Sequence, residues 1–327
     1  MTDSRCRKSL VNYNFNKHTL AEVTRDFHSN VALIESGSWS VTPEGLNIIS
    51  NPFTLTNPKG NEHPKNLHYW NNPFKITDRY ETLYEVEICA TQYFPVNGLP
   101  EIFKSRIRNI DEDIRLCSGA INTLDPETWM VADMFLSNQK IYCFVERLPF
   151  GQTPGHKYAA FSSAVTVIQR PADTKEFIKI GIGLKKSSIR FYVEGALVCH
   201  VPLLGTRAID QFRLLDYQGT AEIIQIKQSY LGFGLFSLLD MQLPDNYARQ
   251  LVVDDFGKNQ SASGLVQLEH TEVYGETLSQ DNRPIVDPNV TWAVPFNPNV
   301  DNTSFKLFGQ GAEMTLKYFK VSQVFDK

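Results

Sequence analysis

Short apolar runs alternate with polar, turn-forming segments along most of the chain. The runs are rich in Val, Ile, Phe, Tyr and Thr and are separated by Gly, Pro, Asn and Asp, a pattern that is typical of paired strands. The strands predicted in this way cover residues 81–90, 129–136, 141–147, 164–168, 177–184, 188–194, 221–228 and 313–321. Because strand follows strand with few helical segments between, the pattern predicts an all-β fold of mostly antiparallel strands.

The alternation is clearest in residues 177–184. The isoleucines at even positions share one face, and Lys179 shares the other with two glycines, because successive side chains of a strand point to opposite faces. The first face is predicted to enter the core and the second to stay open. A short link leads to residues 188–194, in which Phe191 is predicted to face inward and Tyr192 outward, so this region is predicted to be an antiparallel meander.

Helical periodicity is scarce, and the remaining segments are predicted to be short helices or loops. The predicted short helices are residues 9–14, 101–110 and 247–251. Residues 55–73 and 282–302 are polar and rich in Pro and Asn, and both are predicted to be long loops.

The chain has 327 residues, of which 42% are hydrophobic and 12% aromatic, so it can bury a large core. β-Sandwiches of more than about 200 residues are often one domain, and no composition break marks a linker. We therefore expect residues 1–327 to form a single elaborated β-sandwich domain, with residues 1–20 as an N-terminal arm.

Charge and motifs exclude several function classes. The 32 basic and 36 acidic residues give a net charge of -4 and are scattered, which argues against a nucleic-acid or anionic-lipid surface. No apolar run is long enough for a membrane span or a signal peptide, so a cytoplasmic protein is expected. The five cysteines lack a Cys-x-x-Cys pair, and neither a P-loop nor a dinucleotide fingerprint occurs, so we expect reduced thiols, no metal and no cofactor.

Two segments resemble glycoside hydrolases of the laminarinase and lichenase type. Residues 188–198, SIRFYVEGALV, are similar to a hairpin of these enzymes, and residues 314–323, MTLKYFKVSQ, resemble their closing strand. This resemblance implies a concanavalin A-like jelly-roll sandwich. The enzymes also carry a strand with Glu-x-Asp-x-x-Glu, whose spacing points three carboxylates into the cleft, and no such motif occurs here. A retaining glycosidase of that type is therefore not expected.

A broader resemblance is to an uncharacterised, mostly bacterial family of proteins with a domain of unknown function and the same sandwich fold. The segments that carry it are residues 113–120, 124–135, 141–150, 158–161, 232–240 and 309–313. This resemblance implies the fold and no particular reaction.

Two carboxylates stand in unusual places for acidic residues. Asp133 lies in the middle of an apolar strand, and Glu146 ends an aromatic-rich one. If the two strands are neighbours, both side chains share a groove, where burial can raise the pKa of one carboxyl enough for acid/base catalysis. The alternative is structural, with either carboxylate in a buried ion pair with Arg115 or Arg147.

Aromatic and basic side chains form the predicted binding site. Aromatic rings provide flat faces on which sugars or planar ligands pack, and an Arg side chain can bind an anion through two hydrogen bonds. The candidate ligand-binding residues are His68, Tyr69, Trp70, Arg115, Trp129, Tyr142, Arg147 and Tyr158. Two alternatives stay open: the rings can pack a loop against itself, and the arginines can form structural salt bridges.

Two functional hypotheses follow. The first is a cofactor-independent acid/base isomerase, cyclase or hydrolase, which binds an organic substrate in the sheet groove under residues 68–70 with Asp133 and Glu146 as the catalytic pair. The second is a non-catalytic, lectin-like protein that binds a glycan or another ligand on the same aromatic surface. A third interpretation is purely structural, with the sandwich as a subunit of an assembly such as a homo-oligomer.

Overall fold

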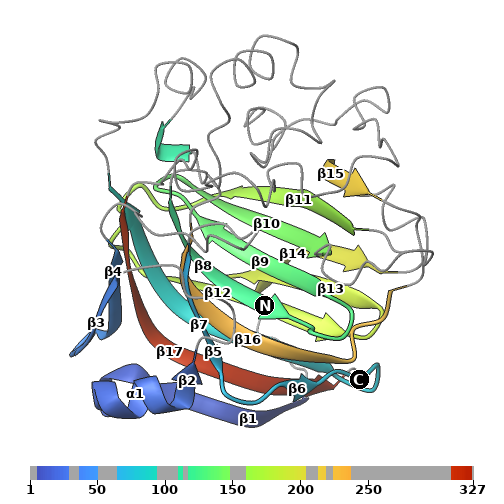
Figure 1. The fold of residues 1–327 in the computed structure, drawn as a ribbon, viewed down its shortest axis with the longest axis horizontal. Helices are drawn as coiled ribbons and strands as arrows, with labels where there is room; N and C mark the ends of the chain where they lie inside the picture. The colour runs from blue at the N-terminus through green and yellow to red at the C-terminus, as the bar shows by residue number, and fades with distance from the viewer. Residues whose placement is uncertain are drawn as a thin grey trace, which may run out of the picture.

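The computed structural model of the protein describes residues 6–28, 37–50, 65–93, 110–112, 117–147, 160–203, 213–218, 224–236 and 311–325. Two antiparallel sheets dominate this part of the chain (Figure 1). The expectation of an all-β, jelly-roll sandwich is therefore confirmed. Helices are short here: the 3-10 helix η1 (Phe15–Lys17), the α-helix α1 (Leu20–Asp26) and the 3-10 helix η2 (Ile110–Glu112). Within the described ranges, no helix is long and apolar enough to cross a membrane.

The first sheet, sheet A, has eight strands. In spatial order they are β14 (Ala196–Pro202), β13 (Ser188–Val193), β12 (Ile178–Lys185), β7 (Glu81–Gln92), β17 (Ala312–Phe325), β4 (Gly45–Ser50) and β3 (Gly37–Thr42), with β1 (Cys6–Asn14) also pairing with β17. The predicted meander is present as β12, β13 and β14, which pair in sequence order.

The second sheet, sheet B, has nine strands. In spatial order they are β15 (Arg213–Gln218), β11 (Ala160–Gln169), β10 (Lys140–Arg147), β9 (Met130–Leu136), β8 (Ser118–Leu124), β16 (Gln228–Phe236), β5 (Lys65–Trp70) and β2 (Phe27–His28), with β6 (Phe74–Lys75) also pairing with β16.

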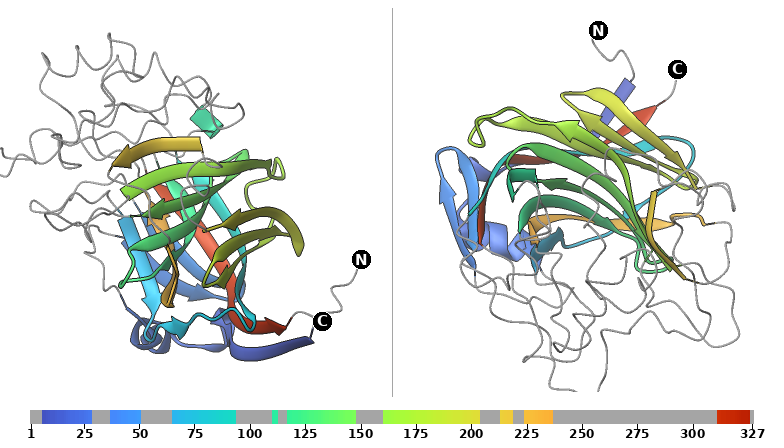
Figure 2. Two further views of the ribbon diagram at one scale, coloured as in Figure 1. Left: turned by 90° about the vertical axis from the view of Figure 1, so that its right-hand side faces the viewer. Right: turned by 90° about the horizontal axis from the view of Figure 1, so that it is seen from above.

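The hydrophobic core lies between the two sheets, which form layers in both views of Figure 2. Sheet A contributes residues such as Val86 and Phe319, and sheet B contributes residues such as Met134 and Phe233. Each of these side chains is fully buried. The inward faces predicted from the period of two are confirmed by Ile180 and its neighbours on β12.

The other face of β12 is not open, which corrects the prediction. A Cβ atom at Gly183 would collide with the carboxylate of Glu81, and a Cβ at Gly181 would lie 3.2 Å from Cγ of Glu85. The two glycines therefore leave room for glutamate side chains of β7 to lie across β12. Tyr192 faces outward as predicted, but it is buried in a small cluster with Leu83 and Val324.

Several predicted elements also differ from the structure. Residues 9–14 are part of strand β1 and not a helix, because this segment pairs with β17 in an antiparallel register. In the predicted loop 55–73, Lys65–Trp70 forms strand β5 because it pairs with β16. In the predicted strand 221–228, residues 224–227 are not part of any strand, and β16 begins only at Gln228. Residues 51–64, 219–223 and 282–302 lie outside the described residues, as do 101–109 and 247–251.

The predicted N-terminal arm is part of the sandwich in the described residues. Strand β1 extends sheet A, and Phe15 is fully buried in the core. The division of the whole chain into domains stays a prediction.

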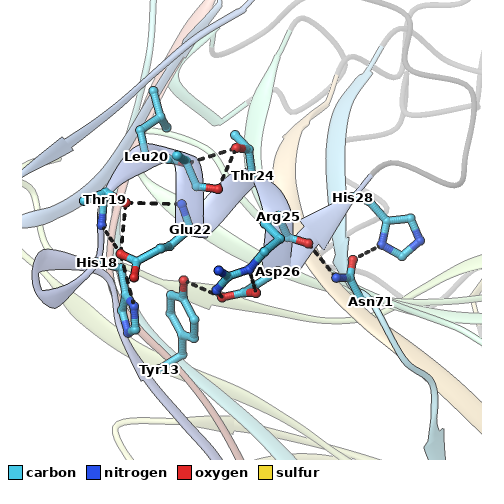
Figure 3. A network of polar contacts seen from close by, with 11 residues as sticks. Tyr13, His18, Thr19, Leu20, Glu22, Thr24, Arg25, Asp26, His28 and Asn71 are labelled. Carbon is cyan, nitrogen blue, oxygen red and sulfur yellow. Dashed lines mark hydrogen bonds and ion pairs between the residues drawn. The ribbon is translucent and has the colours of Figure 1, made fainter.

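Helix α1 is joined to both sheets by a polar network (Figure 3). Its N-terminus carries a capping box, in which the Thr19 side chain accepts from the Glu22 backbone N–H and the Glu22 carboxylate accepts from the Thr19 backbone N–H. At its other end, the Tyr13 hydroxyl of β1 donates to Asp26 Oδ2 over 3.0 Å. The Asn71 amide, just after β5, donates to the Arg25 carbonyl over 2.6 Å. The helix thus connects the edge of sheet B to strand β1 of sheet A.

Candidate functional site

The two predicted carboxylates lie on one face of sheet B. Strands β9 and β10 are neighbours, and the register places Asp133 opposite Phe144 and Glu146 opposite Val131. These residues point away from sheet A, because the alternate residues of β9 and β10, such as Met134 and Cys143, lie in the core between the sheets. We call this side the outer face of sheet B.

Asp133 and Glu146 are diagonal neighbours on the outer face. Residues in this relation have Cα atoms about 7–8 Å apart. Glu146 is half-buried, whereas Asp133 is only 1% exposed. The condition on which the acid/base hypothesis depended, that the two strands are neighbours, is therefore met.

A hydrogen-bonded row crosses the outer face from β5 to β9. The Tyr69 hydroxyl donates to Oδ1 of Asn122, and Nδ2 of Asn122 donates to Oδ1 of Asp133. In the sheet register Tyr69 lies opposite Gly232, Gly232 opposite Asn122, and Asn122 opposite Asp133. Tyr69 and Asn122 are each 3% exposed, so the whole row is shielded from bulk water.

Aromatic side chains surround this row. The residues clustered on the outer face are Leu67, Tyr69, Ala120, Phe135, Tyr142, Phe144 and Phe236. Phe135 makes edge-to-face contacts with Phe144 and Phe236, at ring-centroid distances of 5.1 and 5.4 Å. A carboxylate in such surroundings has lost most of its hydration, which strengthens its interactions with any donor that the protein or a ligand provides.

Arg147 lies on the opposite side of β10 from Glu146. It is the register partner of Met130, a core residue, and its Nε donates to the Thr128 carbonyl over 3.0 Å. The register therefore separates Arg147 from the outer face and from Asp133. Arg115, the other predicted cation, and Tyr158 lie outside the described residues.

The predicted platform of His68, Tyr69 and Trp70 does not form, because adjacent residues of a strand point to opposite faces. Only Tyr69 lies on the outer face. The Trp70 ring stacks on Phe319 between the sheets, at a centroid distance of 5.7 Å. The prediction assumed that residues 68–70 lie in a loop, where three consecutive rings can point to the same side. It is wrong because these residues form strand β5.

His68 also points toward the interior. Its Nε2 lies 2.8 Å from Asn66 Oδ1, and its ring contacts Trp39 edge-on with centroids 3.8 Å apart. Burial, with a smaller contribution from the charge of His28, lowers the pKa of His68 to about 3. His68 is therefore neutral at physiological pH, and its surroundings are those of a structural residue.

Tyr142 belongs to the cluster on the outer face, and Trp129 lies in the connection between β8 and β9. Trp129 does not begin β9 but ends the turn before it, where its φ of 60° is unfavourable for a bulky residue. Asp125 holds this turn by accepting hydrogen bonds from the Glu127 backbone and the Thr128 side chain, at 2.9 and 2.7 Å. The Tyr142 hydroxyl donates to the Glu112 carbonyl over 2.6 Å.

Sequence reasoning missed Asn122 and Gly232. A usable signal for Asn122 exists, because residues 118–124 and 130–136 flank a turn that contains Glu127 and Thr128, and a hairpin centred between these two residues places Asn122 opposite Asp133. No local signal identifies Gly232, because its role depends on the ring of Tyr69, which comes from a different strand.

Metal-binding residues do not cluster in the part of the chain that the structure describes, where no group of three or more His, Cys, Asp or Glu could hold an ion. All five cysteines, each of which is described, are free thiols.

Comparison with known proteins gives one relative of high similarity. The chain is 36% identical over 342 residues to the uncharacterized protein L829 of Acanthamoeba polyphaga mimivirus, covering 85% of this chain and 79% of the viral one. This relative is viral, and a mostly bacterial distribution of the family stays a prediction.

Solved structures with a similar course of the chain include glucanases. An endo-1,3-beta-glucanase from Streptomyces sioyaensis is 9% identical with a TM-score of 0.48, and the match covers 100% of this chain and 99% of the other. A laminarinase catalytic domain from Thermotoga petrophila is also 9% identical, with a TM-score of 0.45 and coverage of 98% and 100%. Identities this low do not assign an activity.

A family model supports the relation that the segments from residue 113 to residue 313 suggested. The model of a family of unknown function, DUF6081, matches residues 15–324, which include every strand from β2 to β17 except the last residue of β17. The chain therefore belongs to the DUF6081 family.

Proposed function

We propose that the outer face of sheet B binds a small organic substrate and that Asp133 and Glu146 move protons to and from it. One observation carries this proposal: a carboxylate that is 1% exposed lies among aromatic rings, accepts a hydrogen bond from Asn122, and has a second carboxylate as its diagonal neighbour. Carboxylates are rarely buried in this way without a structural or chemical role.

The two carboxylates differ in surroundings, which suggests different roles. An amide N–H that donates to a carboxylate stabilises its ionised form, so Asn122 favours Asp133 as the base. Glu146 is half-buried at the end of its strand, where it can take up a proton from water and deliver it. Removal of a substrate proton by Asp133 and addition of a proton from Glu146 at another position would isomerise a substrate with no change in its composition, and return of the proton from Asp133 to Glu146 would restore both groups.

The aromatic cluster favours an organic substrate with an apolar or planar part over a glycan. Glycan-binding surfaces present exposed ring faces to solvent, whereas Phe135, Tyr142 and Phe144 are buried. This contrast supports the catalytic hypothesis over the lectin-like one.

A ligand screen on three variants tests the proposal. Native mass spectrometry and thermal shift would measure the binding of planar aromatic metabolites and of β-1,3-glucan oligosaccharides to the full-length protein. The oligosaccharides are included because glucanases are among the similar structures. Asp133→Asn and Glu146→Gln remove the proposed base and acid with little change in shape. The matched control is Glu127→Gln, which changes an exposed carboxylate paired with Lys227.

The expected result is that an aromatic metabolite binds and is converted by the wild type and by the Glu127 variant. Either site variant is expected to lose at least about 100-fold in turnover while keeping its fold. Binding of glucan oligosaccharides alone, unchanged in Asp133→Asn and Glu146→Gln and without turnover, would replace the proposal with the lectin-like function.

A further inference from the structure

We propose that Tyr69 is a positioning residue that keeps Asp133 in its proton-accepting state by fixing the orientation of the Asn122 side-chain amide. The inference rests on the proposed function, because it explains why Asp133 and not Glu146 acts as the base. It assigns to Tyr69 a role different from direct ligand binding.

The row is built so that Tyr69 can reach Asn122 across an intervening strand. Strand β16 lies between β5 and β8, and its residue in this row is Gly232. A Cβ atom at Gly232 would lie 2.6 Å from Cδ1 and 3.0 Å from Cε1 of the Tyr69 ring. The ring therefore occupies the space that any other residue at position 232 would fill, and its hydroxyl reaches Asn122.

The chemistry of an amide turns this contact into control over Asp133. The Asn side chain has an oxygen that only accepts and a nitrogen that only donates. Because the Tyr69 hydroxyl donates to Oδ1 of Asn122, Nδ2 points along the row toward Asp133. An ionised carboxylate accepts from Nδ2 more strongly than a protonated carboxyl does, because the protonated group can accept only through neutral oxygens.

Loss of the Tyr69 hydroxyl removes this preference. The Asn122 amide can then turn over and present Oδ1 to Asp133, an orientation that suits a protonated carboxyl. The pKa of Asp133 should therefore rise when Tyr69 is replaced by Phe, although Tyr69 does not contact Asp133 through any hydrogen bond in the row.

The test is a direct titration of Asp133 in the full-length protein. Carboxyl 13C NMR would follow Asp133 in the wild type, in Tyr69→Phe and in Tyr230→Phe. Tyr230 is the matched control, because its ring packs edge-to-face on Tyr69, 6.3 Å between centroids, from the neighbouring strand β16. We expect the Asp133 titration to move up by about one pH unit in Tyr69→Phe and to stay in place in Tyr230→Phe. No rise in Tyr69→Phe, or the same rise in both variants, would overturn the inference.

A second measurement on the wild type does not depend on a variant that folds. If the row is coupled, the 15N resonance of the Asn122 side-chain amide shifts with the same midpoint as the Asp133 carboxyl. If the 15N chemical shift of the Asn122 side-chain amide stays constant while Asp133 titrates, the coupling is refuted. Neither titration needs a substrate, so a protein with coupled titrations but without turnover would refute the proposed function alone.

Discussion

The outer faces of the two sheets both bury carboxylates, but they hold them in different ways. On sheet A, Glu81 accepts from the Tyr192 hydroxyl and lies 3.8 Å from the Arg190 guanidinium. Glu85 is paired with Arg7 at 2.9 Å and with Lys179 at 2.7 Å. These carboxylates lie beside cations from other strands of sheet A, namely β1, β12 and β13.

On sheet B, the row supplies neutral partners to Asp133. Asp133 accepts a hydrogen bond from the Asn122 amide, whose own oxygen accepts from the Tyr69 hydroxyl. An amide N–H that donates to a carboxylate stabilises its ionised form. The comparison shows that burial alone does not mark a functional carboxylate, and that the chemistry of its partners is the more informative feature.

The largest expected effect comes from Glu81 on sheet A. Glu81→Ala leaves Arg190 and the Tyr192 hydroxyl without their shared acceptor, and breaking a buried ion pair costs about 3–5 kcal/mol in the free energy of unfolding. Urea denaturation would measure this, with Glu127→Ala, an exposed carboxylate, expected to show no measurable change. If the two variants are equally stable, the contacts of Glu81 with Arg190 and Tyr192 do not stabilise the fold.

Acid should weaken the fold through His68, which shares β5 with Tyr69 but faces the interior. The pKa of His68 is about 3 in the folded state and about 6.5 when unfolded, so its stabilisation is complete above pH 6.5 and is lost as the pH falls toward 3. Between pH 5.5 and 4, His68 should contribute a loss of about 1.4 kcal/mol per pH unit. In denaturation curves at several pH values, His68→Gln should remove this slope, and an unchanged slope would assign it to other groups.

Paired hydroxyl deletions compare the two faces directly. Tyr192→Phe removes a hydrogen bond to a charged acceptor and should cost about 1.5–3 kcal/mol, whereas Tyr69→Phe removes one to a neutral amide and should cost about 0.5–1.5 kcal/mol. Both free energies of unfolding can be measured with urea under the same conditions. An effect at Tyr69 as large as that at Tyr192 would argue that the row on sheet B is as firmly structural as the ion pairs on sheet A.

The capping box of helix α1 provides a reference outside both faces. Thr19→Ala removes the acceptor of the Glu22 backbone N–H and should cost about 1 kcal/mol. Carboxyl NMR should show no change in the titration of Asp133, because α1 lies on neither outer face. A shift of Asp133 in this variant would mean that the site responds to any loss of stability, and the Tyr69 result would lose its meaning.

Much of the fold could be predicted because strand periodicity is local. The inward face of β12, the meander of β12 to β14 and the strands that carry Asp133 and Glu146 all follow from alternating side chains. The prediction failed at Lys65–Trp70, whose polar and Pro-rich neighbourhood resembles a loop, because pairing with β16 and not composition makes it a strand. The three aromatic residues there then separated onto two faces.

By itself, the sequence determined the all-β class of the fold, the positions of several strands such as β7, β12 and β13, and the placement of Asp133 and Glu146 in apolar strands, because a period of two is visible in adjacent residues. Only the tertiary structure decided that β16 lies between β5 and β8, and hence that Tyr69 and Asn122, 53 residues apart, meet over Gly232. The order of strands in a sheet depends on how the whole core packs. No local pattern contains that information, and the row that orients Asp133 exists only once the order is set.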